Sequence, residues 1–110
     1  MNLRQIDHDF AVAGQIAPAD VPTLAAAGFR SIICNRPDHE EPGQPSYAEI
    51  EKAAKEAGLS AAFVPVRSGG VTADDVANMA AALEDAERPT LAYCRSGARS
   101  TTIYGLALRK

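Results

Sequence analysis

The stretch that decides the fold is "LAYCRSGARSTTIYG", residues 91–105. It opens with an apolar run that stops at Cys94, continues through a short segment rich in arginine, serine and glycine, and ends in residues that favour a helix. This order predicts a buried strand, a tight loop and the first turns of a helix. In open α/β sheets ligands bind beyond the carboxyl ends of the strands, so this loop is the first place to look for a site.

The loop that begins at Cys94 is typical of an oxyanion-binding site. Successive backbone N–H groups can curl around one point, and the helix that follows adds partial positive charge at its N-terminus. Glycine permits a positive φ at the turn, and the guanidinium of Arg99 offers a planar fork to two anion oxygens. The residues expected to hold a phosphate or sulfate ion are Arg95, Ser96, Gly97, Ala98 and Arg99.

The same surroundings predict that Cys94 is a thiolate nucleophile. A free cysteine has a pKa of about 8.5, which falls to about 3.5–7.5 at helix N-termini or beside cations. We expect Ser100 to donate its hydroxyl toward the sulfur and to help the sulfur leave at the end of a covalent cycle. Cysteine is also a common buried apolar residue, but the glycine, the arginine and the helix that follow Cys94 favour the nucleophile.

Upstream of this stretch, apolar runs alternate with amphipathic segments. Strands are expected over residues 10–16, 30–35, 59–66 and 88–94, and helices over residues 17–28, 47–58, 73–86 and 98–110. The expected N-caps of the first three helices are Asp20, Ser46 and Thr72. Glu49 and Asp75 stand three residues after their caps, which predicts capping boxes. Pro22 falls in the first turn of its helix, where the missing N–H does no harm.

Strands that alternate with helices indicate one α/β domain over residues 1–110, with a central, mainly parallel sheet between two layers of helices. The chain stops about ten residues into its last helix, so it either ends there or is part of something longer. The net charge of −3 gives no general attraction to nucleic acid, and no apolar run is long enough to span a bilayer. The first residues do not form a signal peptide, and the two cysteines suggest a cytoplasmic protein with reduced thiols.

Three polar segments are expected at one rim of the sheet: residues 34–38, 67–70 and 94–99. Arg36 and Arg67 would then enlarge the basic pocket, although each could also be a solvated loop cation. Asn35 either braces the loop or forms an Asx turn. Cys34 is either a buried structural cysteine or the partner of Cys94 in a regulatory disulfide, which requires Cα atoms within about 7 Å.

The motif "CRSGARS" (94–100) resembles the active-site loops of two families. One is the rhodanese sulfurtransferases; the other is the phosphatase-like domain described as beta-lactamase-hydrolase-like, of the nonclassical tyrosine and dual-specificity phosphatase type. Two segments usual in rhodaneses, Asp-x-Arg and Gly-His-Ile-x-Gly-Ala, do not occur here. The segments "VAGQIAPAD", "GFRSIICNRPDHEEPGQPS" and "AGLSAAFVPVRSGGVTADDV" are similar to the phosphatase-like family in order and spacing. This resemblance covers residues 8–108.

The phosphatase-like resemblance implies a cysteine-phosphatase fold and the hydrolysis of a phosphate monoester. Cys94 would attack phosphorus, Arg99 would clamp the phosphoryl oxygens, and Ser100 would assist release. Related phosphatases carry an aspartate on the loop after the preceding strand, where this chain has Ser68 or Gly69. The expected substitute for this general acid is Asp38, with Asp74 as a second option.

Two other functions stay open at this stage. The chain could be a rhodanese-like sulfurtransferase that carries a persulfide on Cys94, or a non-catalytic domain that binds an oxyanion or docks a partner. For the phosphatase, the expected partner is a phosphorylated small molecule or a phosphoprotein. The sequence implies no cofactor and no metal.

Overall fold

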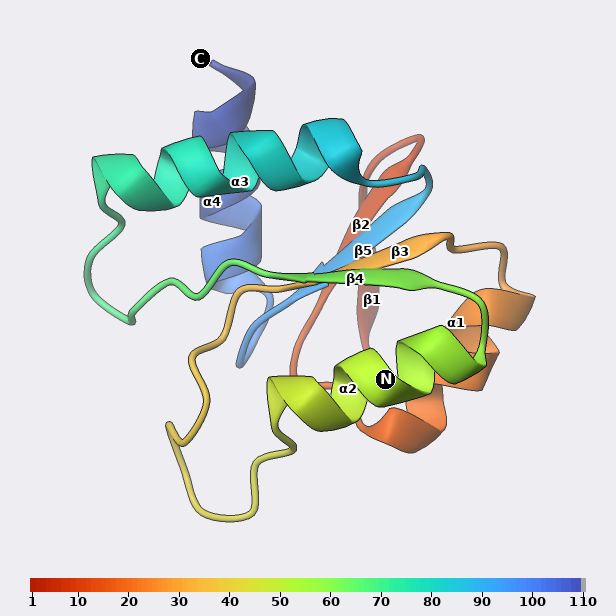
Figure 1. Ribbon diagram of the computed structural model, residues 1–110. Coiled ribbons are helices and arrows are strands. Elements are labelled where there is room, and N and C mark those ends of the chain that lie inside the picture. The colour runs from red at the N-terminus through yellow and green to blue at the C-terminus, as the bar shows by residue number, and fades with distance from the viewer. Residues whose placement is uncertain (110) are drawn as a thin grey trace.

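The computed structural model describes residues 1–109, and Lys110 lies outside the described residues. Its centre is a five-stranded sheet in the order β1-β2-β5-β3-β4 (Figure 1). The strands are β1 (Leu3–Asp7), β2 (Phe10–Ala13), β3 (Ser31–Cys34), β4 (Ser60–Phe63) and β5 (Thr90–Tyr93). The helices are the 3₁₀ turn η1 (Pro18–Asp20), α1 (Val21–Ala26), α2 (Tyr47–Glu56), α3 (Ala73–Asp85) and α4 (Ala98–Leu108).

Helices cover both faces of the sheet, which confirms the expected three-layer α/β architecture (Figure 1). On one face, Val21 and Leu24 of α1 pack with Ile50 and Ala54 of α2 against buried strand residues. On the other face, α3 and α4 supply the core residues Met79, Leu83, Ile103, Tyr104 and Ala107. Strands β2, β5, β3 and β4 run parallel, so their carboxyl ends meet at one edge. No helix in residues 1–109 combines the length and the apolar character needed to cross a membrane.

Strand β1 is the element that the sequence pattern did not predict. It pairs antiparallel with β2 at the edge of the sheet, so the sheet is mixed rather than wholly parallel. Four of its five residues are exposed. An exposed edge strand buries no continuous apolar face, and it therefore lacks the alternation by which strands are found in a sequence.

The helix boundaries agree with the expected caps, with two corrections. Thr72 and Asp75 form the reciprocal capping box, with both N···O distances at 3.0 Å. Ser46 accepts from the N–H of Glu49, but the Glu49 carboxylate does not return the bond within the described residues. Asp20 precedes α1 as expected; its carboxylate, however, accepts from the N–H of Ala17 and closes the 3₁₀ turn instead of capping α1.

Residue alternation along β3 and β5 decides where the two cysteines point. Cys34 and Tyr93 are register partners, and both pack in the core under α1 and α2. Cys94 follows Tyr93, so its side chain faces the other side of the sheet. The two thiols therefore lie on opposite faces, and both are free. The disulfide considered for this pair is not formed, and this geometry does not favour it.

Candidate active site

The loop after β5 is held against the end of β2 by backbone contacts. The N–H of Cys94 donates to the carbonyl of Ala13 at 3.3 Å, and the N–H of Gln15 donates to the carbonyl of Arg95 at 3.2 Å. A Cβ on Gly14 would lie 2.9 Å from the Arg95 carbonyl oxygen, so only glycine fits there without displacing the loop. Gly97 has a φ of 93° and directly precedes α4, which confirms the turn expected at this glycine.

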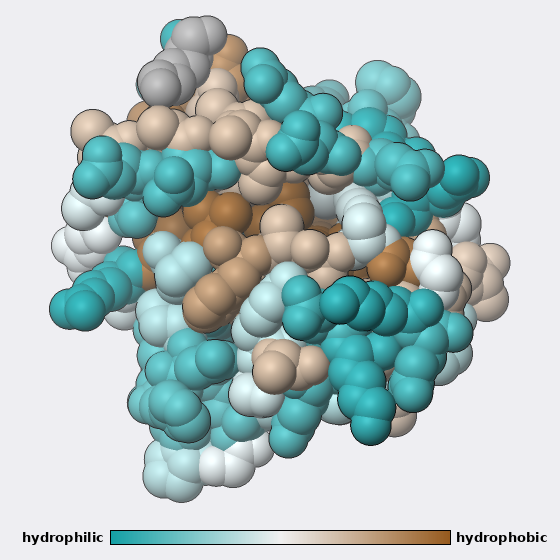
Figure 2. Space-filling view, in the orientation of Figure 1, coloured by the Kyte–Doolittle hydropathy of each residue, from teal (hydrophilic) through white to brown (hydrophobic). Residues whose placement is uncertain are grey.

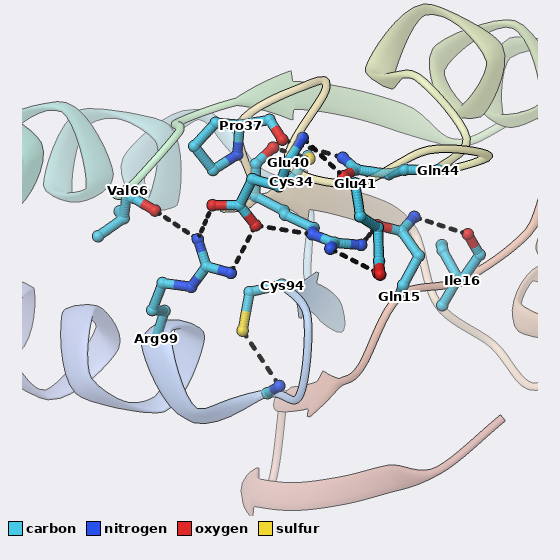
Figure 3. Close-up of polar contacts among 12 residues, drawn as sticks. Gln15, Ile16, Cys34, Pro37, Glu40, Glu41, Gln44, Val66, Cys94 and Arg99 are labelled. Carbon is cyan, nitrogen blue, oxygen red and sulfur yellow. Dashed lines mark hydrogen bonds and ion pairs between the residues drawn. The ribbon is translucent and has the colours of Figure 1, made fainter. Parts of the chain in front are cut away.

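The Cys94 sulfur sits inside this loop and is wholly buried. Its Sγ accepts a hydrogen bond from the N–H of Gly97 at 3.1 Å (Figure 3). Burial acts to raise the pKa of the Cys94 thiol, but the backbone N–H groups of Ser100 and Ser96, the Ser100 hydroxyl and the N–H of Gly97 outweigh it, and the net pKa lies below the ordinary cysteine value. The direction of this pKa shift is the one that the sequence predicted for Cys94.

Ser100 and Asn35 form a buried brace behind the cysteine. The Ser100 hydroxyl donates to Oδ1 of Asn35 at 2.8 Å, and neither residue has exposed surface. The Asn35 amide nitrogen donates in turn to the carbonyl of Val64 at 3.0 Å and to Sδ of Met79 at 3.6 Å. The Ser100 hydroxyl thus donates to Asn35, and it is also among the groups that lower the pKa of Cys94, so its expected role beside the sulfur stays a prediction. Asn35 does brace the loop, the first of its two interpretations.

Arg99 holds a carboxylate in its fork. Its Nη1 donates to Oε2 of Glu40 at 2.7 Å, and its Nη2 donates to Oε1 at 2.8 Å (Figure 3). Nη1 also donates to the carbonyl of Val66 at 2.8 Å, which fixes the plane of the guanidinium. The arginine therefore presents two parallel donors above the Cys94 loop, the arrangement that matches two oxygens of an oxyanion.

Arg36 is buried beside Arg99, with only 2% of its side chain exposed. Its guanidinium donates to Glu40 at 2.8 Å, to Glu41 at 2.9 Å and to Oε1 of Gln15 at 3.1 Å. The Arg99 guanidinium, aided by Arg36, holds the pKa of the Glu40 carboxyl at about 2. Sequence reasoning placed Arg36 here but missed Glu40, Glu41 and Gln15, which lie in segments that carry the family resemblance but were assigned no role in the site.

The pocket over the loop has a volume of about 250 Å³. It is lined by Arg36, Glu40, Glu41, Ser68, Arg95 and Arg99. Within the loop, the N–H of Ala98 donates to the Ser96 hydroxyl at 3.4 Å. The N–H groups of Gly97 and Ala98 therefore both donate to partners inside the loop, Cys94 and Ser96.

Arg67 does not line this pocket, contrary to expectation. It is exposed and borders a neighbouring groove of about 400 Å³ together with Pro37, Phe63 and Pro65. Figure 2 shows apolar surface in this region, between β4 and α3. Arg67 therefore lies beside the pocket and adds no donor to it in this structure.

The carboxylate of Asp38, the expected general acid, accepts a hydrogen bond from the backbone at the start of α2. Its Oδ1 accepts from the N–H of Tyr47 at 2.8 Å, at the first residue of α2. Asp74 is an exposed residue in the first turn of α3. The structure thus brings neither aspartate to the Cys94 loop, because each carboxylate stands at a helix N-terminus.

Cys34, the other cysteine, lies in surroundings that keep its thiol protonated. Its thiol donates to the carbonyl of Arg36 at 3.2 Å, and burial raises its pKa to about 11. The contrast with Cys94 comes from the surroundings: Cys34 lies among apolar side chains, whereas Cys94 faces backbone N–H groups.

The two cysteines should therefore differ in how alkylation depends on pH. A lowered pKa means that the Cys94 thiolate persists below the ordinary cysteine value and is lost only as the pH falls through the lowered one. Cys34 should stay protonated until the solution is strongly alkaline. Peptide mapping after timed iodoacetamide treatment at several pH values checks this. An alkylation rate at Cys94 that climbs only above the ordinary cysteine pKa would contradict a stabilised thiolate.

The cysteine, the arginine fork and the loop between them, at the carboxyl end of a central parallel strand, define a fold of the tyrosine and dual-specificity phosphatase type. The model of the family "Beta-lactamase hydrolase-like protein, phosphatase-like domain" matches residues 2–109, and the chain belongs to this family.

Relatives agree with this assignment. A beta-lactamase hydrolase-like protein of Agrobacterium fabrum is 41% identical over 106 residues, which cover 96% of this chain and 25% of that protein. The chain thus spans about a quarter of the length of this curated relative.

Two solved structures share the fold. A Neisseria meningitidis protein described provisionally as a phosphatase is 35% identical, with a TM-score of 0.83 over 92% of this chain and 72% of that one. The core catalytic domain of the yeast (S. cerevisiae) PP-IP phosphatase SIW14, solved in complex with citrate, has a TM-score of 0.62 at 17% identity, over 99% of this chain and 75% of that one. At that identity the likeness concerns the fold alone.

Proposed function

We propose that this domain hydrolyses a phosphate monoester through a thiophosphate intermediate on Cys94. The observation that carries the proposal is the position of the Arg99 fork, which holds two carboxylate oxygens above the loop that surrounds the sulfur. Two oxygens of a phosphoryl group can take the same donors. The family and the fold support phosphatase chemistry, and the lowered pKa of Cys94 supplies the nucleophile.

In the first step the phosphoryl group settles over the loop of residues 94–99, with two of its oxygens toward the fork of Arg99. The Cys94 thiolate attacks phosphorus; the S–P bond forms while the ester P–O bond breaks, and the leaving oxygen departs with the electron pair and takes a proton from solvent water. In the second step water attacks phosphorus and gives up a proton to solvent, the S–P bond breaks, and phosphate and the thiolate are released. Preorganised donors of this kind supply a large share of catalysis, because they need no reorientation as charge develops.

Protonation of the leaving oxygen is the demanding part of this cycle. Glu40 and Glu41, which line the pocket, are ionised because arginine lowers the pKa of each carboxyl. Asp38 could serve as the acid only if it released the N–H of Tyr47. We therefore propose that the preferred substrates are esters whose leaving group departs with little help, such as the phosphate of a phenol. A phosphorylated small molecule or a phosphoprotein can carry such a group.

A second candidate function is sulfur transfer. The position of the Arg99 fork above the Cys94 loop favours this function as well. When a thiolate attacks the outer sulfur of thiosulfate, a new S–S bond forms, the old S–S bond breaks, and sulfite leaves with the electron pair. This step needs no general acid. Two free cysteines fit a reducing compartment, and we place either activity in the cytoplasm.

The two candidates separate in paired assays. The protein is incubated with a series of aryl phosphates that starts with p-nitrophenyl phosphate and, separately, with thiosulfate and cyanide. Phosphatase chemistry predicts phenol release that rises steeply as the pKa of the leaving phenol falls, because no acid protonates it. Thiocyanate formation without phenol release would reject the phosphatase and support the sulfurtransferase. Oxyanion binding without turnover in either assay would indicate a binding module.

A further inference from the structure

We propose that Glu40 is an intramolecular occupant of the oxyanion site, and that it selects which anion enters. Its carboxylate takes the donors that a substrate oxyanion needs, so it must leave before a substrate binds. The inference rests on the proposed oxyanion site around Cys94, but not on whether phosphorus or sulfur is transferred there.

Glu40 makes the contacts with Arg99 and Arg36 that a bound oxyanion would make. Its two oxygens accept three hydrogen bonds, two from Arg99 and one from Arg36, at 2.7 to 2.8 Å. With Val66 also bound to Nη1, the edge of the Arg99 guanidinium formed by Nη1 and Nη2 is taken in this arrangement. Cys94 beneath it has no exposed surface. A substrate that is to use this edge of Arg99 must therefore displace Glu40, and the buried sulfur becomes accessible only if groups around it move.

The loop that carries Glu40 is built to present it. His39, the preceding residue, has a φ of 64°, a left-handed conformation that non-glycine residues adopt at an energetic cost. The side chain of Gln44 then fixes the loop from both sides: its Oε1 accepts from the N–H of Glu40 at 3.1 Å, and its Nε2 donates to the carbonyl of Pro37 at 2.9 Å. A strained residue and a two-point clamp direct one carboxylate into the pocket.

The departure of Glu40 leaves Arg36 paired, whereas Arg99, 15% exposed, keeps only the carbonyl of Val66. Arg36 keeps Glu41 at 2.9 Å and Gln15 at 3.1 Å, so it stays satisfied. The Glu40 side chain is 22% exposed and can turn toward water. The pocket then gains one positive charge, held by the fork of Arg99. An entering anion must outcompete a carboxylate for this fork, so a dianionic phosphoryl group should enter and a monoanion should be rejected.

The test is the affinity for inorganic phosphate, measured by calorimetry for the wild-type chain, Glu40→Gln and Glu41→Gln. The two variants remove the same charge from the same loop, but only Glu40 contacts Arg99. Losing a competitor with charge-assisted bonds should tighten phosphate binding by about tenfold or more in Glu40→Gln. Glu41→Gln should stay within about threefold of wild type, because it leaves the competing carboxylate in place.

Alkylation of Cys94 provides a second measurement. Iodoacetamide should modify Cys94 faster in Glu40→Gln than in wild type, and phosphate should protect it. If Glu40→Gln does not fold, Glu40→Asp replaces it in both measurements, because its shorter side chain keeps the charge. Glu40→Asp should show a smaller change in the same direction. Phosphate affinity that is unchanged or weaker in a folded Glu40 variant would overturn the inference and make Glu40 a structural brace. Tighter phosphate binding without any turnover would reject the proposed function and keep the inference.

Discussion

Replacement of Cys94 by serine should lower p-nitrophenyl phosphate turnover by about 10⁴-fold or more, the scale seen when an enzyme loses its nucleophile. A serine hydroxyl is nearly the size of the thiol and can still accept from the N–H of Gly97, so the loop should keep its shape. It is not ionised at neutral pH, however, and the surroundings that lower a thiol pKa do not lower an alcohol pKa far enough to make an alkoxide. Steady-state kinetics measure the loss.

The matched control for this substitution is Cys34→Ala. Cys34 lies on the opposite face of the sheet and keeps its proton, because burial raises its pKa to about 11. Turnover by Cys34→Ala should remain near the wild-type value. Cys94→Ser should also still bind phosphate, since the donors of the loop and of Arg99 are unchanged. Turnover that survives in Cys94→Ser would remove the nucleophile from the mechanism.

Arg99→Lys should lower kcat/KM by about 10²-fold to 10³-fold, the range seen when one preorganised donor to a developing oxyanion is lost. Lysine keeps the charge but has no planar fork, so it cannot make two parallel bonds to the phosphoryl oxygens. It also loses the bond to the carbonyl of Val66 that sets the orientation of the guanidinium. The loss should appear in both kcat and phosphate affinity.

Arg30→Lys is the control for the arginine. Arg30 pairs with Glu87 at 3.1 Å and precedes β3, at the end of the sheet opposite the site. The change should leave kcat/KM within about twofold of wild type, because exposed ion pairs contribute little. If Arg99→Lys kept wild-type kinetics, then charge alone, and not the shape of the fork, would hold the substrate.

Local signals explain why the core of the site could be predicted. The loop from Cys94 to Ser100 is one continuous segment, and its strand, glycine and helix leave few other conformations. The parallel strands followed from their apolar runs, and the brace by Asn35 was one of the two interpretations that its place at the end of β3 allowed. Each of these inferences needed only the residues of one segment and the rule that sites lie at strand ends.

Long-range pairings explain what could not be predicted. The contact between Glu40 and Arg99 joins residues that are 59 positions apart, and a glutamate in a polar loop ordinarily faces water. Asp38 matched the expected acid by type and place, but its carboxylate also fits the N-terminus of α2, and only the fold shows that it is used there. Strand β1 pairs through its backbone, so its side chains carry no pattern that could reveal it.

The most direct test of the central claim is the mass of the enzyme during turnover. Wild-type protein is mixed with p-nitrophenyl phosphate, quenched in acid, and analysed as intact protein and as peptides. A thiophosphate mechanism predicts a mass increase of one phosphoryl group on the peptide that contains Cys94, and no such increase in Cys94→Ser. A phosphoryl group on any other residue, or an adduct of one sulfur atom that appears only with thiosulfate, would contradict phosphoryl transfer through Cys94.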